Sequence, residues 1–148
     1  DYVKKKYALA IGEQTAETVK IGIGSALPAK EKMEHRIRGR NLITGLPKDI
    51  VMNSNEISDA LNPYLAEIIS SVQTVFNSTL PELVADIMAK GIILSGGSAQ
   101  IHHLPEFFER CLGVPAYVAE DPLFCVARGT GLILDHLATY KQTLLNKR

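Results

Sequence analysis

Apolar residues three or four positions apart run along the middle of the chain and predict one long amphipathic helix. Asn53 and Glu56 have the spacing of a capping box and mark its start. Pro63 lies inside the pattern, and we expect it to bend the helix without breaking it. The apolar stripe of this helix consists of Ile57, Leu61, Leu65, Ile68, Ile69, Val72 and Phe76.

Shorter segments on either side of this helix alternate between helical and extended patterns. Residues 92–95 form a short, β-branched apolar run, which is typical of a buried parallel strand. A helix at 104–112 and a second strand at 116–119 would follow, which implies a right-handed crossover in an α/β sheet. The other predicted elements are the end of a helix at 1–7, a helix at 15–23, a strand at 33–38, a turn at 39–41, a strand at 49–52, a helix capped by Thr79 and ended by Gly91, and a helix at 122–145.

These elements predict two parts of different character. Residues 1–24 and 91–148 are expected to form an α/β layer. Residues 25–90, with the hairpin and the long helix, are expected to form an inserted α+β subdomain. Because no repeat or low-complexity tract separates the two parts, we expect them to pack directly against each other.

The composition excludes several classes of protein. A chain of 148 residues with 46% hydrophobic residues fits one or two globular units and is too apolar for a disordered chain. Its 16 basic and 16 acidic residues cancel, so no overall field favours nucleic acid or an anionic membrane. No apolar run is long enough to span a bilayer, and no secretory signal is present. We expect a cytosolic protein, with Cys111 and Cys125 as buried free thiols.

The strongest candidate for a binding site is Gly96-Gly97-Ser98-Ala99, which follows the predicted strand at 92–95. Glycines at the carboxyl end of a buried strand let the backbone approach a ligand closely, and nucleotides often bind at this edge of α/β sheets. The motif has neither the lysine of a phosphate loop nor the spacing of a dinucleotide fingerprint. A tight turn without any ligand explains the same four residues equally well.

A second candidate is the pair Glu17 and Lys20, which share one face of a predicted helix. A carboxylate can accept hydrogen bonds from ribose hydroxyls, and an ammonium can donate to ring nitrogens. A solvated ion pair is the simpler interpretation of these two residues alone. No arrangement typical of nucleophilic or acid–base catalysis, and no metal-ligand spacing, stands out. We therefore predict no catalytic and no metal-binding residue in this chain.

Basic residues gather along the predicted hairpin. Arg36, Arg38 and Arg40 form a basic stretch, which nearby acidic residues offset only in part. Lys30 and Lys32 precede them. This basic stretch fits either an acidic partner surface or a charged face that is simply solvated.

Four segments, in this order and spacing, match the motifs of one protein family. Residues 91–99 are similar to the adenosine motif shared by actins, seventy-kilodalton heat-shock chaperones and sugar kinases. Residues 12–21 resemble the segment that brings a glutamate and a lysine to the adenosine, and residues 41–47 and 119–131 resemble further segments of the family. Over nearly its whole length the chain therefore resembles the C-terminal half of the bacterial actin homologue MreB and its paralogues, the rod-shape-determining family.

The resemblance implies an actin-like ATPase fold of the ribonuclease H-like kind. It also implies that Glu17 and Lys20 point toward the ribose and base, and that Gly96, Gly97, Ser98 and Ala99 approach the adenine and the nearer phosphates. The implied ligand is ATP, with Mg²⁺ in the intact protein. The implied function is self-association into cytoplasmic filaments beneath the inner membrane, which govern bacterial cell shape and wall synthesis together with other cell-shape or wall-synthesis proteins.

Two features of that family, the phosphate-binding hairpins and the membrane-inserting elements, are not in this sequence. We therefore expect ATP hydrolysis only in an intact protein, and neither direct membrane contact nor a nucleic-acid partner for this chain. Two alternatives stay open. The chain is either part of another actin-like ATPase, such as a division-type homologue, or an interaction module that keeps the fold without hydrolysing ATP. A sugar kinase would need a sugar-binding carboxylate, which the sequence does not identify.

Overall fold

The structure of this protein is a computed structural model, which describes residues 1–145. Residues 146–148, which belong to the predicted part 91–148, lie outside the described residues. The elements are α1 (Tyr2–Tyr7), β1 (Leu9–Ala10), α2 (Glu13–Ile23), β2 (Glu34–Asn41), β3 (Pro47–Asn53), α3 (Ser54–Ser78), α4 (Pro81–Lys90), β4 (Ile92–Leu94), the 3₁₀ turn η1 (Gly97–Gln100), α5 (Leu104–Leu112), β5 (Ala116–Val118), α6 (Cys125–Asp135) and α7 (Leu137–Leu145).

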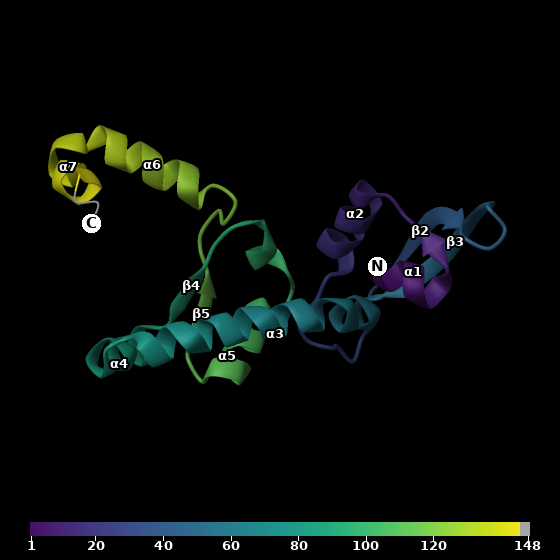
Figure 1. The fold of residues 1–148 in the computed structure, drawn as a ribbon, viewed down its shortest axis with the longest axis horizontal. Coiled ribbons are helices and arrows are strands. Elements are labelled where there is room, and N and C mark those ends of the chain that lie inside the picture. Colours follow the sequence, from purple (N-terminus) through teal and green to yellow (C-terminus); the bar gives the residue numbers. More distant parts are fainter. Residues whose placement is uncertain (146–148) are drawn as a thin grey trace.

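The long helix α3 forms the axis of the molecule (Figure 1). It starts with the predicted capping box, in which the Asn53 side chain accepts from the backbone N–H of Glu56 at 3.2 Å and the Glu56 carboxylate accepts from that of Asn53 at 2.9 Å. The helix then continues through Pro63 without a break, as predicted. None of the helices within residues 1–145 combines the length and apolarity needed to cross a membrane.

The hairpin β2–β3 and the short strand β1 form an antiparallel sheet at one end of α3. β2 lies in the middle of this sheet, and its buried Ile37 pairs with Ile50 of β3. α2 and the first turns of α3 pack against the sheet. The resulting core consists of Leu9, Val19, Ile23, Ile37, Met52 and Ile57.

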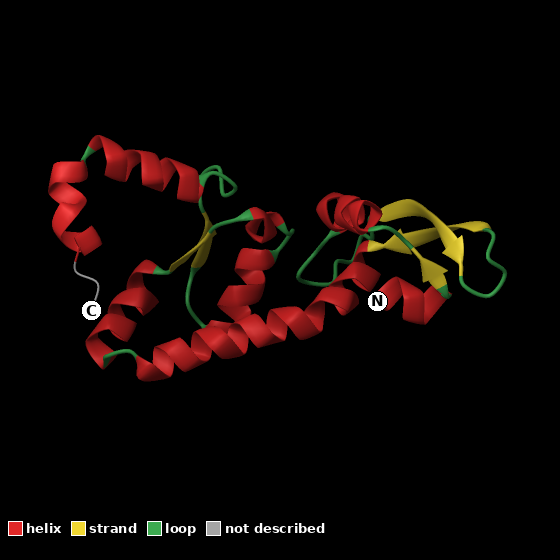
Figure 2. Cartoon of the chain, turned by 45° about the horizontal axis from the view of Figure 1, so that its top comes forward, coloured by secondary structure: helices red, strands yellow, loops and turns green. Residues whose placement is uncertain are grey.

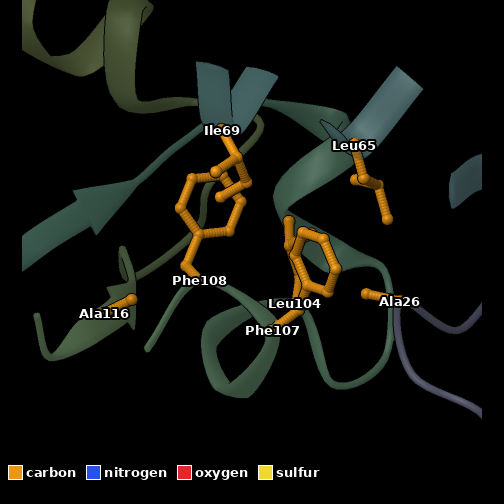
Figure 3. Packing of buried hydrophobic residues seen from close by; sticks show 7 residues of the cluster. All are labelled: Ala26, Leu65, Ile69, Leu104, Phe107, Phe108 and Ala116. Carbon is orange, nitrogen blue, oxygen red and sulfur yellow. The ribbon is translucent and has the colours of Figure 1, made fainter. Parts of the chain in front are cut away.

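A second core lies beside the middle of α3. β4 and β5 pair in parallel, as predicted, and α5 crosses between them. Phe107 and Phe108 of α5 meet edge to face, with ring centroids 6.2 Å apart, and Figure 3 shows Phe108 pointing toward Ile69 of α3. The buried members of this core are Ala26, Leu65, Ile69, Leu104, Phe107, Phe108 and Ala116.

The packing of residues 1–24 differs from the predicted grouping with residues 91–148. β1 pairs with β2, and Val19 and Ile23 of α2 are buried against the hairpin core. The sequence pattern did not show this, because a strand of two residues carries no alternation to detect. We therefore group residues 1–24 with the hairpin, and the division of the chain into two domains stays a prediction.

Three predicted turns or helix ends were also wrong. Residues 39–41 belong to β2, and the chain reverses at residues 42–46 instead. Thr79 does not cap α4, because its hydroxyl donates to the carbonyl of Val75, and Leu80 takes the N-cap position. The predicted helix at 122–145 is divided at His136, whose backbone leaves the helical region.

Both cysteines are free, as predicted, but neither is buried. Cys111 is exposed on the last turn of α5, and Cys125 is partly exposed at the start of α6. The apolar neighbours of Cys111 in the sequence turn toward α3 instead, because the helix places them on a different face.

Candidate functional site

The predicted pair on α2 lies at the edge of the hairpin core. Val19 and Ile23 bury one face of α2, which leaves Glu17 exposed and Lys20 half-buried beside it. Within residues 1–145, Glu17 and Lys20 form no ion pair with each other, so the simple interpretation as a solvated pair has no support in the geometry. Both charged groups are therefore available to a ligand.

Lys20 also borders a cavity. This cavity has a volume of about 570 Å³ and lies among α1, β1, α2 and the first half of α3. Its walls are mostly apolar and include Leu9, Ala16 and Leu61. Glu17 is not one of the lining residues and is exposed to solvent beside it.

The predicted glycine motif forms a tight turn directly after β4. Gly96 has a φ of 88°, and its N–H donates to the carbonyl of Pro122 at 2.7 Å. Gly97–Gln100 then form the single 3₁₀ turn η1, which buries Ala99 and leaves Gly97 and Ser98 exposed. The structure thus offers an exposed backbone and the hydroxyls of Ser95 and Ser98 near the carboxyl end of β4.

A short backbone ladder holds α2 and η1 in fixed positions relative to each other. His102, two residues after η1, donates its N–H to the carbonyl of Gly24 at 3.1 Å. Its own carbonyl accepts from the N–H of Ala26 at 2.8 Å, which makes Ser25 and His102 a parallel bridge. In both Figure 1 and Figure 2, α2 and η1 lie on the same side of α3. The two sequence-predicted groups are therefore neighbours that the backbone connects through this ladder.

The groups in this arrangement can bind a ligand. A carboxylate, an ammonium, a hydroxyl and free backbone groups can hold the hydroxyls and ring nitrogens of a nucleoside. Within residues 1–145, no three His, Cys, Asp or Glu side chains gather as a metal site.

The sequence interpretation missed one polar cluster, which joins α1 to the first turn of α3. Glu56 is only 8% exposed, and its carboxylate accepts from Lys6 Nζ at 2.7 Å and from the hydroxyl of Tyr7. Burial disfavours the charged form of Glu56, but the hydrogen bonds from Lys6, Tyr7 and the Asn53 backbone outweigh it and lower the pKa of this carboxyl. The carboxylate in turn raises the pKa of Tyr7. No local signal reveals this cluster, because its partners are about fifty positions apart in the chain.

Gly96 is expected to tolerate a side chain poorly. Because its φ of 88° is rarely adopted by residues with a Cβ, Gly96→Ala should lower the free energy of unfolding by about 1 kcal/mol. Gly97→Ala is the matched control: its new Cβ would lie 3.3 Å from Cδ2 of the exposed Leu123, which can move away. Urea unfolding of the two variants measures the difference. Equal free energies of unfolding for the two variants would contradict the positive φ of Gly96.

A comparison with protein families identifies the chain. It matches the model of the MreB/Mbl protein family over residues 1–142. This chain belongs to the MreB/Mbl family. Among its relatives, it is 43% identical over 137 residues to the cell shape-determining protein Mbl of Bacillus cereus, covering 93% of this chain and 41% of that protein. It is 45% identical over 135 residues to the cell shape-determining protein MreB of Escherichia coli, covering 91% and 39%.

Solved structures of MreB proteins have the same fold. The crystal structure of MreB5 of Spiroplasma citri bound to ADP matches 99% of this chain with a TM-score of 0.88 and 35% identity, and this match covers 44% of that chain. The MamK double helical filament matches 83% of this chain with a TM-score of 0.68 at 20% identity and covers 38% of that chain, which shows the fold alone. The actin-like ATPase fold implied by the sequence is therefore confirmed. The chain spans about two fifths of the length of the curated MreB and Mbl relatives.

Proposed function

We propose that this chain is the adenosine-binding and self-associating part of an ATP-dependent MreB-like cytoskeletal protein. The observation that carries the proposal is the ladder between Gly24–Ala26 and His102, which holds α2 and η1 beside each other. A nucleoside between them would meet Glu17 and Lys20 on one side and the η1 backbone on the other. The ADP bound to MreB5 of Spiroplasma citri supports an adenine nucleotide as the ligand.

The proposed roles follow from the chemistry of each group. Glu17 would accept hydrogen bonds from the ribose hydroxyls, and Lys20 would donate to the base or pack its stem against it. Gly96, Gly97, Ser98 and Ala99 would approach the adenine and the nearer phosphates. We propose that phosphoryl transfer and Mg²⁺ binding depend on other residues of the intact protein, as the resemblance to the family implies.

The cellular function that we propose is cell-shape determination, after which the MreB and Mbl relatives are named. Filaments of the intact protein would lie in the cytoplasm beneath the inner membrane and act with other cell-shape or wall-synthesis proteins. The MamK filament, which shares the fold, is compatible with self-association. This chain would reach the membrane through those partners rather than by direct contact.

Thermal unfolding of the intact protein with ATP, ADP and adenosine tests nucleotide binding, because a ligand that binds only the folded state raises the unfolding temperature. We expect all three to stabilise the protein. Glu17→Ala should weaken the affinity for adenosine about tenfold, the loss of one charge-assisted hydrogen bond. Lys20→Ala should also reduce the stabilisation.

The control is Glu31→Ala, which removes an exposed carboxylate from the segment before β2. It should leave the affinity for adenosine unchanged. If Glu17→Ala and Glu31→Ala behave alike, the role of Glu17 is wrong. If none of the three ligands stabilises a protein that melts cooperatively, the chain is an interaction module rather than a nucleotide clamp.

A further inference from the structure

β3 is an edge strand whose outer side is open. It pairs with β2 along one side, and β2 separates it from β1. The N–H of Asn41 donates to the carbonyl of Leu46 at 2.8 Å, next to the turn of the hairpin. Because hydrogen-bonded and non-hydrogen-bonded pairs alternate in an antiparallel ladder, this bond assigns the even-numbered residues of β3 to the bonds with β2. The N–H and carbonyl groups of Asp49 and Val51 therefore point away from β2, toward the open edge.

No part of the described chain covers this edge. Within residues 1–145, the backbone groups of Asp49 and Val51 have no backbone partner outside the hairpin. In Figures 1 and 2 the hairpin projects beyond the start of α3, away from α4 to α7. A row of free N–H and carbonyl groups is a template for a further strand, and proteins often protect such an edge with proline. Pro47 removes only the N–H at the first residue of β3 and leaves the edge beyond it open.

The outward face of the hairpin is basic. The alternating burial of β2 leaves four charged side chains exposed on one face, those of Glu34, Arg36, Arg38 and Arg40. Asp49 of β3 shares this face, so three arginines and two carboxylates give it a formal charge of +1. The guanidinium of Arg38 donates to Asp49 at 2.6 and 2.9 Å. Within residues 1–145, Arg36 and Arg40 form no ion pair, so their charges are available to a partner.

Arg36 carries one of these free charges close to the open edge. It lies directly opposite Val51 in the register of the hairpin. Side chains of such non-hydrogen-bonded pairs are close together, and an arginine can lay its apolar stem along a neighbour while its charged end stays in water. The guanidinium can thus reach across Val51 to a carboxylate on a strand beside β3. Val51, which is 49% exposed, offers apolar contact to the same strand.

Free backbone groups and free guanidinium groups together indicate the class of partner. A peptide in extended conformation pairs with the N–H and carbonyl groups of Asp49 and Val51 through its own backbone. A nucleic acid or an anionic membrane meets the arginines but has no row of alternating N–H and carbonyl groups for the edge. Because the unpaired charges on this face are those of arginines, carboxylates on the peptide favour its binding.

We infer that β3 accepts an extended acidic segment of a partner protein as a fourth strand, with Arg36 bound to one of its carboxylates. The backbone of the segment pairs with Asp49 and Val51, and its charge selects it among extended peptides. The turn at residues 42–46 takes no part in this contact. The inference goes beyond the proposed function, because it needs neither a nucleotide nor assembly.

Fluorescence anisotropy of the complete protein with a labelled peptide tests the inference. The probe has about eight residues, the length of a typical strand, and alternates glutamate with threonine so that its carboxylates share one face. We expect saturable binding that weakens with added salt. Arg36→Glu should weaken the affinity about tenfold or more, the loss of one charge-assisted hydrogen bond. Lys5→Glu, at an exposed site on α1, makes the same change in net charge and should alter the affinity less than about twofold.

Two N-methylated peptides separate strand addition from attraction by charge alone. One carries the methyl groups on the amides of its glutamates and the other on those of its threonines, so both keep the charge of the parent peptide. Because the amides of alternate residues point to opposite edges of a strand, only one of the two sets faces β3. One methylated peptide should therefore lose binding, and the other should bind within about twofold of the parent. Equal affinity of the two would overturn the strand addition.

The variants and two other probes complete the test. Equal weakening by Arg36→Glu and Lys5→Glu would mean that overall charge attracts the peptide, and it would overturn the inference. The absence of peptide binding would overturn it as well, including the case in which the protein binds phosphatidylglycerol vesicles or polyuridylic acid instead. None of these results bears on the proposed function, which the unfolding experiments with adenosine and its nucleotides test separately.

Discussion

Replacing Phe108 by alanine is expected to lower the free energy of unfolding of this chain by about 3–5 kcal/mol. Phe108 is 5% exposed and lies between α5 and α3, where it belongs to the same core as Ile69 and Phe107. Its removal takes apolar area out of the core and leaves a cavity that the two helices cannot close without moving. Urea unfolding followed by circular dichroism measures the change.

Phe124→Ala is the matched control for this prediction. Phe124 is 60% exposed, so its replacement should change the free energy of unfolding by no more than about 0.5 kcal/mol. The comparison decides whether α5 is docked on α3 in solution. A loss below about 1 kcal/mol for Phe108→Ala would mean that it is not.

The features predicted correctly from the sequence depend on residues close together in the chain. Asn53 and Glu56 are three positions apart, and their reciprocal hydrogen bonds need only the first turn of α3. Gly91 ends α4 with a φ of 85°, a conformation that glycine adopts at little cost. The parallel pairing of β4 and β5 follows from the handedness of a strand–helix–strand unit.

The features that the sequence did not predict depend on contacts between distant residues. β1 is only two residues long and exists because β2 offers it an edge, so the pattern did not show that β1 pairs with the hairpin. The helix expected at 122–145 ends at Asp135 because a single residue, His136, leaves the helical region. Neither the pairing of β1 nor the helix end at His136 changes the apolar spacing on which the predictions were based.

The candidate site, too, was predicted only where residues close together in the chain define it. The spacing of Glu17 and Lys20 and the glycines after β4 were visible in the sequence, because each group lies within one element. What joins the two groups is the ladder from Gly24 and Ala26 to His102, which spans more than seventy positions. Hydrogen bonds between backbone groups carry no side-chain signature, so only the fold reveals that the two groups are neighbours.

The buried carboxylate of Glu56 supports the second large prediction. It joins three elements, since it accepts from Lys6 and Tyr7 of α1 and from the backbone of Asn53 at the end of β3. Glu56→Ala should lower the free energy of unfolding by about 2–3 kcal/mol, because the partly buried hydroxyl of Tyr7 and the N–H of Asn53 would lose their acceptor. Asp59→Ala, at an exposed carboxylate one turn later in α3, should cost less than about 0.5 kcal/mol.

The same network predicts how stability depends on pH. The pKa of Glu56 is lower in the folded chain than its ordinary value of about 4.5, so the unfolded state binds more protons in this range. The stabilisation is therefore complete above the ordinary value and is lost as the pH falls from there through the lower pKa of the folded chain. Urea unfolding at several values between about pH 7 and about pH 3 measures this loss.

Glu56→Gln isolates the contribution of this carboxyl, because glutamine keeps an acceptor oxygen but does not titrate. The variant should be less stable than the parent at neutral pH, and the difference should shrink as the solution becomes acidic. Asp49, whose pKa is lowered by the Arg38 guanidinium, titrates in both proteins and cancels in the comparison. A constant difference from neutral to acidic pH would mean that Glu56 stabilises the chain through its shape and its capping oxygen alone. In that case its charge would not tie α1 to α3.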